Sequence, residues 1–268
     1  MYSLKARLLA TLVAGALALC AAGCGAAVPE EPPAPAETAQ NEEALPLPEE
    51  EAPEEDPPRS PWLEDAVELT DIDWEAFQTV MSAEEYAALQ EYLPVLAGQE
   101  TFLWSEEEDR WPKGGAPEPY AADIETVREV LAGEDALLVL GVGPLDLDGD
   151  GTMELALYLG NRGGHNLILH QEDGAFYGTD RTIRAFNALE KNGRYSTSGG
   201  ANWGDVCVMD CQGGVFTEVV LGRRRPSEDP DELDPVYYIG DEQVSREEFL
   251  QWDEENSPGS AYYTPTKK

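Results

Sequence analysis

The sequence predicts an α+β domain, with N-terminal helices, then an antiparallel β-meander, then a closing C-terminal helix. Apolar residues recur at helical spacing between about residues 82 and 131. From residue 136 onward the apolar runs become short and are separated by glycine-containing turns, which is typical of strands. A second helical pattern follows near residue 245. Helices followed by a series of strands favour an α+β fold over an alternating α/β fold.

Two helices are expected in the first third of the domain. The first begins at the capping box Ser82-x-x-Glu85 and is kinked or stopped by Pro94. The second begins near Asp123, presents one apolar face and stops at Gly133.

The stretch 101–120 between these helices is polar and irregular, yet it contains Trp104, Trp111 and Tyr120. Aromatic side chains in a loop suit a surface that binds carbohydrate or peptide. They equally serve to pin a long loop to the core, which is the interpretation we favour here.

The meander is expected from eight short apolar runs separated by turns such as Asn192-Gly193. Residues 184–191 have the pattern of a short helix that ends at this turn. The capping box Ser245-x-x-Glu248 starts the closing helix. The expected strands are residues 136–142, 154–159, 165–170, 175–178, 194–198, 205–211, 215–221 and 236–239.

An acidic loop separates the first two of these strands, with the sequence Asp-Leu-Asp-Gly-Asp-Gly-Thr-Met-Glu. Ca²⁺ takes six to eight oxygen ligands at about 2.3–2.6 Å, and short carboxylates on a tight loop supply them. The spacing therefore predicts a calcium site. Its ligands are the side chains of Asp146, Asp148 and Asp150, the carbonyl of Thr152 and the carboxylate of Glu154.

The flanks of this loop distinguish it from an EF-hand. An EF-hand needs a glutamate at its twelfth position, which is Leu157 here, and it needs helices where this sequence predicts strands. The meander therefore contains a strand–calcium loop–strand unit. This unit resembles the loop of FG-GAP repeats, with Glu154 at the ninth place where those loops usually carry aspartate. The alternative is an acidic turn that binds no ion tightly.

Residues 1–23 have the pattern of an export signal, with Lys5 and Arg7 before an apolar core. The small residues Ala-Ala-Gly before Cys24 resemble the lipobox of bacterial lipoproteins. That resemblance implies cleavage before Cys24 and lipidation of its thiol, so that the chain is anchored to the membrane. Simple secretion with cleavage near Gly23 is the alternative.

Residues 24–60 are rich in proline, glutamate and alanine, and Arg59 is their one basic residue. Such a segment buries too little apolar surface to fold, so a disordered tether is expected after the lipidated cysteine. Residues 61–268 are long enough for a single domain with its own core. We expect an extracytoplasmic protein on the outer face of the bacterial cell membrane.

A wider resemblance covers residues 82–252. The pattern is similar to that of uncharacterised bacterial surface lipoproteins in which one FG-GAP-like Asp-x-Asp-Gly-Asp-Gly loop precedes a β-meander. The resemblance implies no catalytic residues, because these proteins have no established activity. The residues that carry it are 167–178, 193–201, 237–240 and 244–249.

Composition excludes several other classes. The formal net charge of −37 argues against nucleic-acid binding. The chain has only two histidines, which limits zinc chemistry and histidine-based catalysis. His165 and His170 are five residues apart and face opposite sides of a strand, so they cannot share a metal ion and we expect structural roles.

Two cysteines, Cys207 and Cys211, lie in the expected domain. On one continuous strand they share a face about 13 Å apart, which is too far for a disulfide. A disulfide requires a turn between them. We favour the interpretation that both are small buried apolar residues.

Catalytic motifs are weak in this sequence. The run from Asp146 to Asp150 resembles the motif of haloacid dehalogenase-type phosphatases, but Asp150 stands where threonine is expected and no β/α alternation follows. Because the chain has so many acidic residues, some pair of carboxylates will always be near the spacing that a glycosidase requires. Such a pair therefore does not indicate glycosidase activity. The sequence therefore predicts a non-catalytic surface binding or interaction module for a cell-wall, carbohydrate or protein ligand. The alternative is a calcium-stabilised envelope or polysaccharide-processing hydrolase.

Overall fold

The computed structural model describes residues 63–106, 118–200, 202–229 and 234–268, and all of them fall in one compact unit. The expected export signal, the lipidated Cys24, the tether and Trp111 lie outside the described residues. Within the described ranges the fold is mixed α+β with mostly antiparallel strands and few helices, which confirms the expected class. No helix in these ranges is long and apolar enough to span a membrane.

The first sheet has seven strands, and its centre is an antiparallel meander of four consecutive strands. Among the strands of the described residues, only β2 and β7 pair in parallel. In spatial order the strands are β1 (Val67–Glu68), β4 (Leu138–Leu145), β5 (Glu154–Leu159), β6 (His165–Glu172), β7 (Ala175–Thr182), β2 (Phe102–Ser105) and β3 (Tyr120–Ala122).

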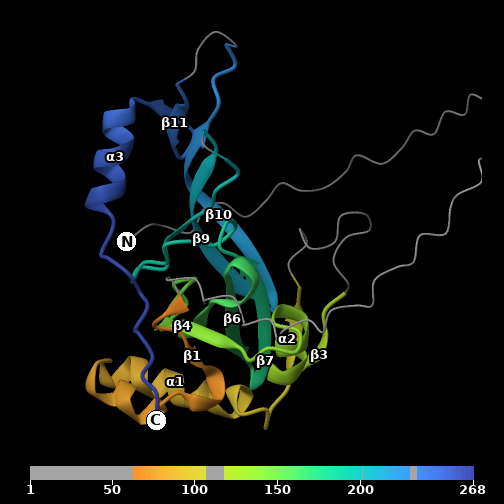
Figure 1. The fold of residues 1–268 in the computed structure, drawn as a ribbon. Coiled ribbons are helices and arrows are strands. Elements are labelled where there is room, and N and C mark those ends of the chain that lie inside the picture. Colours follow the sequence, from red (N-terminus) through yellow and green to blue (C-terminus); the bar gives the residue numbers. More distant parts are fainter. Residues whose placement is uncertain (1–62, 107–117, 201, 230–233) are drawn as a thin grey trace, which may run out of the picture. The chain divides into compact units, whose positions relative to one another are not determined.

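A second, five-stranded antiparallel sheet is built from the rest of the expected meander. Its long strands β9 and β10 reach from the neighbourhood of α3 to β6 and β7 (Figure 1). The structure thus divides into two sheets what the sequence suggested as one meander. In spatial order the strands are β12 (Glu242–Val244), β11 (Val236–Ile239), β10 (Val215–Arg225), β9 (Gly204–Gln212) and β8 (Tyr195–Ser196).

Three α-helices begin where local caps were expected. Ser82 and Ser245 form complete capping boxes, and the Asp123 side chain accepts from Thr126 N. The first helix runs two residues beyond Pro94 before it ends. The helices are α1 (Ala83–Leu96), α2 (Ile124–Leu131) and α3 (Arg246–Glu255), with short 3₁₀ turns at Leu69–Asp71, Trp74–Thr79 and Asn161–Gly163.

The two faces of the first sheet are covered differently. Leu155 and Leu157 of β5 pack in one core cluster with residues of α1 and α2, which lie on that side of the sheet (Figure 1). Ala156 and Ile168 face the other way, into a second cluster with Cys207 of β9. Side chains alternate along a strand, so the even-numbered residues of β5, which include Ala156, point toward the second sheet.

Two expectations about the connecting segments are wrong. Residues 184–191 form turns, because Asn187 exchanges backbone hydrogen bonds with Ser196 and so cannot join a helical ladder. The expected irregular stretch contains β2 and the start of β3. Trp104 on β2 is fully buried and packs on Tyr120 with 5.8 Å between ring centroids, so these two aromatic residues belong to the core.

The C-terminal helix packs on the second sheet, where Phe249 contacts Tyr237 with 5.3 Å between ring centroids. The chain does not end there. Residues after α3 return to the first sheet and form isolated bridges between Tyr263 and Val142 and between Lys267 and Ile72. The domain is therefore closed by this extended segment as well as by the expected helix.

Candidate metal centre

The acidic loop connects β4 to β5, and its aspartates are turned inward onto its own backbone. Asp146 accepts hydrogen bonds from Gly149 N at 2.7 Å and from Gly151 N at 3.1 Å. Both glycines have positive φ, 77° and 93°, which other residues rarely adopt. The glycines thus allow the chain to wrap around the first carboxylate.

Asp148 joins this loop to the second sheet. Its Oδ1 accepts from Asp150 N at 3.0 Å, and its Oδ2 accepts from Cys211 N of β9 at 3.3 Å. Asp150 in turn accepts from Thr152 N at 2.6 Å. The carboxylates therefore pair with the backbone amide groups of the loop while their remaining lone pairs stay available for a cation.

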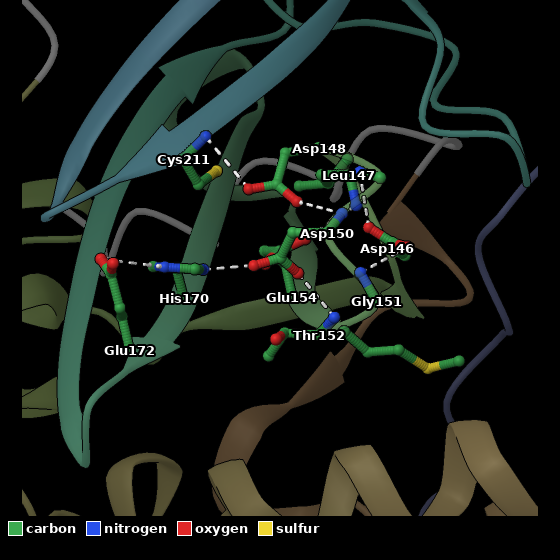
Figure 2. A network of polar contacts seen from close by, with 12 residues as sticks. Asp146, Leu147, Asp148, Asp150, Gly151, Thr152, Glu154, His170, Glu172 and Cys211 are labelled. Atoms are coloured by element: carbon green, nitrogen blue, oxygen red, sulfur yellow. Dashed lines mark hydrogen bonds and ion pairs between the residues drawn. The ribbon is translucent and has the colours of Figure 1, made fainter. Parts of the chain in front are cut away.

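Glu154 is fully buried at the start of β5. One carboxylate oxygen, Oε2, accepts from Leu147 N at 2.7 Å, and the other, Oε1, accepts from His170 Nδ1 at 2.8 Å (Figure 2). The pairing of Leu155 with Leu169 places Glu154 opposite His170 on the neighbouring strand. Glu154 therefore fixes the position of the loop through the hydrogen bond from Leu147 N, and its carboxylate is also available as a metal ligand.

Three of the five expected ligands converge. One carboxylate oxygen each of Asp146, Asp148 and Glu154 lies within 4.8 Å of the other two. Asp150 and Thr152 lie exposed in the same turn but are not part of this close group. An oxygen-only donor set of this kind suits a hard cation such as Ca²⁺.

The charges of the loop are not balanced by nearby cations. Burial, followed by the charges of Asp150 and Asp146, raises the pKa of Asp148 above its usual value. Among the ion pairs of the described residues, none joins a lysine or arginine to any of the three aspartates. Like charges held together in this way favour the binding of a cation.

A second group of ligand-type side chains lies beneath the loop, and the sequence did not indicate it. One ligand atom each of Glu154, His170 and Cys211 lies within 4.8 Å of the other two. In Figure 2, His170 lies between Glu154 and Glu172, whose Oε2 is 3.8 Å from His170 Nε2. Cys211 comes from the second sheet, so only the packing of the two sheets brings this group together.

The other histidine and the cysteines have the expected placement. His165 lies on the opposite face of β6 from His170 and is 3.8 Å from Asp180 Oδ2. Cys207 and Cys211 are buried, free thiols on the continuous strand β9. They do not form a disulfide.

Comparison of the chain with protein-family models, with curated proteins and with solved structures finds no match. The candidate metal centre is therefore described by its own residues and distances alone. Its two parts share Glu154, one made only of oxygen donors and the other of oxygen, nitrogen and sulfur donors.

Proposed function

We propose that this chain is an extracytoplasmic bacterial lipoprotein whose calcium-stabilised domain acts as a non-catalytic binding module at the cell surface. It is anchored to the outer face of the membrane through the acylated Cys24, and residues 24–60 hold the domain away from the bilayer. The observation that carries the proposal is the convergence of Asp146, Asp148 and Glu154. Their carboxylates meet on a loop whose backbone amides they already satisfy.

The proposed calcium ligands are the carboxylates of Asp146, Asp148 and Glu154, which converge, together with the Asp150 carboxylate and the Thr152 carbonyl from the same turn. A bound Ca²⁺ supplies positive charge where like charges meet. An ion that binds only the folded state stabilises that state by mass action. Extracellular calcium sites commonly have dissociation constants of about 10⁻⁴–10⁻³ M, so a weak site suffices outside the cell.

The second sheet offers a surface for a cell-wall, carbohydrate or protein ligand. Trp203 is 52% exposed, and it borders a cavity of about 410 Å³ with polar walls. An exposed indole beside hydroxyl and charged groups suits such ligands, whereas the net charge of −37 disfavours nucleic acid. The lining residues are Thr182, Arg184, Ala185, Thr197, Ser198, Gly199, Trp203 and Glu218.

The calcium part of the proposal is tested by thermal unfolding of the full-length protein with Ca²⁺ and with chelator. At a free Ca²⁺ concentration of ten times the dissociation constant, the bound ion adds about 1.4 kcal/mol to the free energy of unfolding. The double variant Asp146→Asn/Asp150→Asn should lose this gain. Asp173→Asn, a change in another acidic turn, should keep it. The calcium site is disproved if the wild-type protein shows no gain.

The anchor is tested by labelling cells with a fatty-acid analogue. Cys24→Ala should abolish the label and release the protein from the membrane fraction, because the acylated thiol is lost. Cys20→Ala is the matched control and should leave the label in place. Label that persists in Cys24→Ala contradicts the proposed anchor.

The binding role is tested with purified envelope polysaccharide and peptidoglycan in a sedimentation assay. Trp203→Ala should reduce binding at least tenfold while the melting temperature stays near that of the wild type. Val80→Ala removes another exposed apolar side chain, 59% exposed, and should not change binding. Equal binding by both variants excludes the Trp203 surface.

A further inference from the structure

Three side chains of different chemistry meet between the two sheets, below the acidic loop. Glu154 comes from β5, His170 from β6 and Cys211 from β9. Their exposed fractions are 0%, 1% and 4%, and one ligand atom of each lies within 4.8 Å of the other two. Carboxylate oxygen, imidazole nitrogen and thiolate sulfur are the ligand atoms that proteins use for Zn²⁺.

The electrostatics of this group favour a cation. His170 Nδ1 is 2.8 Å from Glu154, and Nε2 is 3.8 Å from Glu172, so both ring nitrogens face carboxylates. Asp148 lies next to the same place, because its Oδ2 accepts from Cys211 N. Both ring nitrogens of His170 therefore face negative charge, which favours a cation at this place.

Glu172 is positioned to support a metal-bound histidine. Its Oε2 accepts from Gly213 N at 2.6 Å, which fixes the carboxylate on the far side of the ring. Histidine ligands of metal ions usually direct their second ring N–H toward a carboxylate or a carbonyl. If Nδ1 of His170 binds a metal ion, Nε2–H points toward Glu172. His170 Nε2 has no hydrogen-bond partner within the part of the chain that the structure describes.

We propose that Glu154, His170 and Cys211 bind a divalent ion of the zinc class in the layer between the two sheets. Zn²⁺ binds Nδ1 of the neutral ring, whose one proton is then on Nε2, and it replaces the proton of the Cys211 thiol, which leaves to solvent. Asp148 or a water molecule completes a tetrahedral set. Burial raises the pKa of the Cys211 thiol, and a bound cation offsets that effect.

This site is distinct in chemistry from the calcium loop, although Glu154 belongs to both. The oxygen-only group suits a hard ion, whereas a thiolate and an imidazole select a softer one. The competing explanation is a metal-free hydrogen bond between Glu154 and His170 with Cys211 as an apolar neighbour. That explanation gives Cys211 no spectroscopic role, and this difference allows a direct test.

The experiment is a titration of full-length, reduced and chelator-treated protein with Co²⁺, followed by displacement with Zn²⁺. We expect one Co²⁺ per chain, intense visible bands of a tetrahedral ion and a near-ultraviolet thiolate-to-metal band. Cys211→Ser should lose the thiolate band. Cys207→Ser, which changes a buried free thiol on the same strand, should retain it. A band that survives Cys211→Ser, or no band in the wild type, overturns the proposal.

Two further measurements separate this site from the calcium site and from loss of folding. Asp146→Asn/Asp150→Asn should retain the Co²⁺ spectrum even though it loses the calcium effect. His170→Gln should weaken Zn²⁺ binding more than tenfold while the calcium effect persists. In the wild-type protein, Zn²⁺ binding should release at least the thiol proton in weakly buffered solution. Zinc binding without proton release overturns the proposal without requiring any variant to fold.

Discussion

His170 Nδ1 donates a 2.8 Å hydrogen bond to Glu154 Oε1 across adjacent strands of the first sheet. The other oxygen of the same carboxylate accepts from Leu147 N in the acidic loop. One buried side chain therefore connects the loop to β6, and it lies beside Cys211 of the second sheet. The stability of the loop and of the interface between the sheets is coupled through Glu154.

Glu154→Ala should lower the free energy of unfolding by about 3–5 kcal/mol in the presence of chelator, because it breaks the buried pair of Glu154 and His170 and leaves the imidazole without its partner. It also leaves Leu147 N without an acceptor. Glu154→Gln is the matched control and should cost less, since its carbonyl can still accept from Leu147 N. Urea unfolding at pH 6 measures both values. An alanine variant that costs under about 1 kcal/mol contradicts this role.

Without bound metal, the stability of the protein should fall as the pH rises above about 6.5, the usual pKa of histidine. The hydrogen bond to Glu154 raises the pKa of His170 in the folded state. A raised pKa means that the folded state retains a proton that the unfolded state has lost, so stability decreases through that range.

Urea unfolding with chelator between pH 6 and pH 9 measures this pH dependence. His170→Gln should flatten it, because glutamine does not titrate. A wild-type stability that increases over the same range contradicts the assignment.

Asp123→Ala should lower the free energy of unfolding by about 0.5–2 kcal/mol, because the N-cap of α2 is lost. Asp123 Oδ1 accepts from Thr126 N and from Thr126 Oγ1, each at 2.8 Å. These bonds lower the pKa of Asp123, so its contribution is present above about pH 3.9 and is lost as the pH falls below that value. Asp123→Asn keeps an acceptor and should be milder in chemical unfolding at pH 7. If Asp123→Ala and Asp123→Asn lose equal amounts of stability, the proposed role of Asp123 as the N-cap is contradicted.

Gly222→Ala should loosen α3 from the second sheet. A Cβ atom at this position on β10 lies 2.8 Å from the ring of Trp252 and 3.0 Å from that of Phe249, so the helix must shift. Overpacking of this kind costs about 1–3 kcal/mol. A red shift of the tryptophan emission should accompany the loss. Leu250→Ala on the exposed side of α3 should change stability by less than about 0.5 kcal/mol and leave the emission unchanged.

Local signals were sufficient for some elements of the fold. The capping boxes at Ser82 and Ser245 form within four residues of chain, so no tertiary information is needed to predict them. Strand β2 was missed because it is short and pairs in parallel with β7, which follows much later in the sequence. The helix predicted at residues 184–191 was wrong because Asn187 pairs with Ser196 and Lys191 N donates to Gly259 O, and these hydrogen bonds override a weak helical pattern.

The candidate site also has one part that the local sequence predicts and another part that depends on tertiary packing. The spacing of Asp146, Asp148 and Asp150 within one loop predicts the acidic turn from the sequence alone. The expected strands 154–159 and 165–170, paired end to end, already place Glu154 opposite His170. The sequence therefore contains the pattern that brings these two side chains together. Cys211 could not have been added from the sequence, because the packing of one sheet on another is not specified by strand patterns.

The return of the chain after α3 to the first sheet affects the order in which the domain can be assembled. Thr266 O accepts from Asp73 N, and Lys268 N donates to Asp71 O, so the last residues pair with the first turns of the domain. Contacts between such distant positions form late, because a long loop must close before they add stability. A chain emerging from a ribosome thus cannot form these contacts until residues 266–268 have left the exit tunnel.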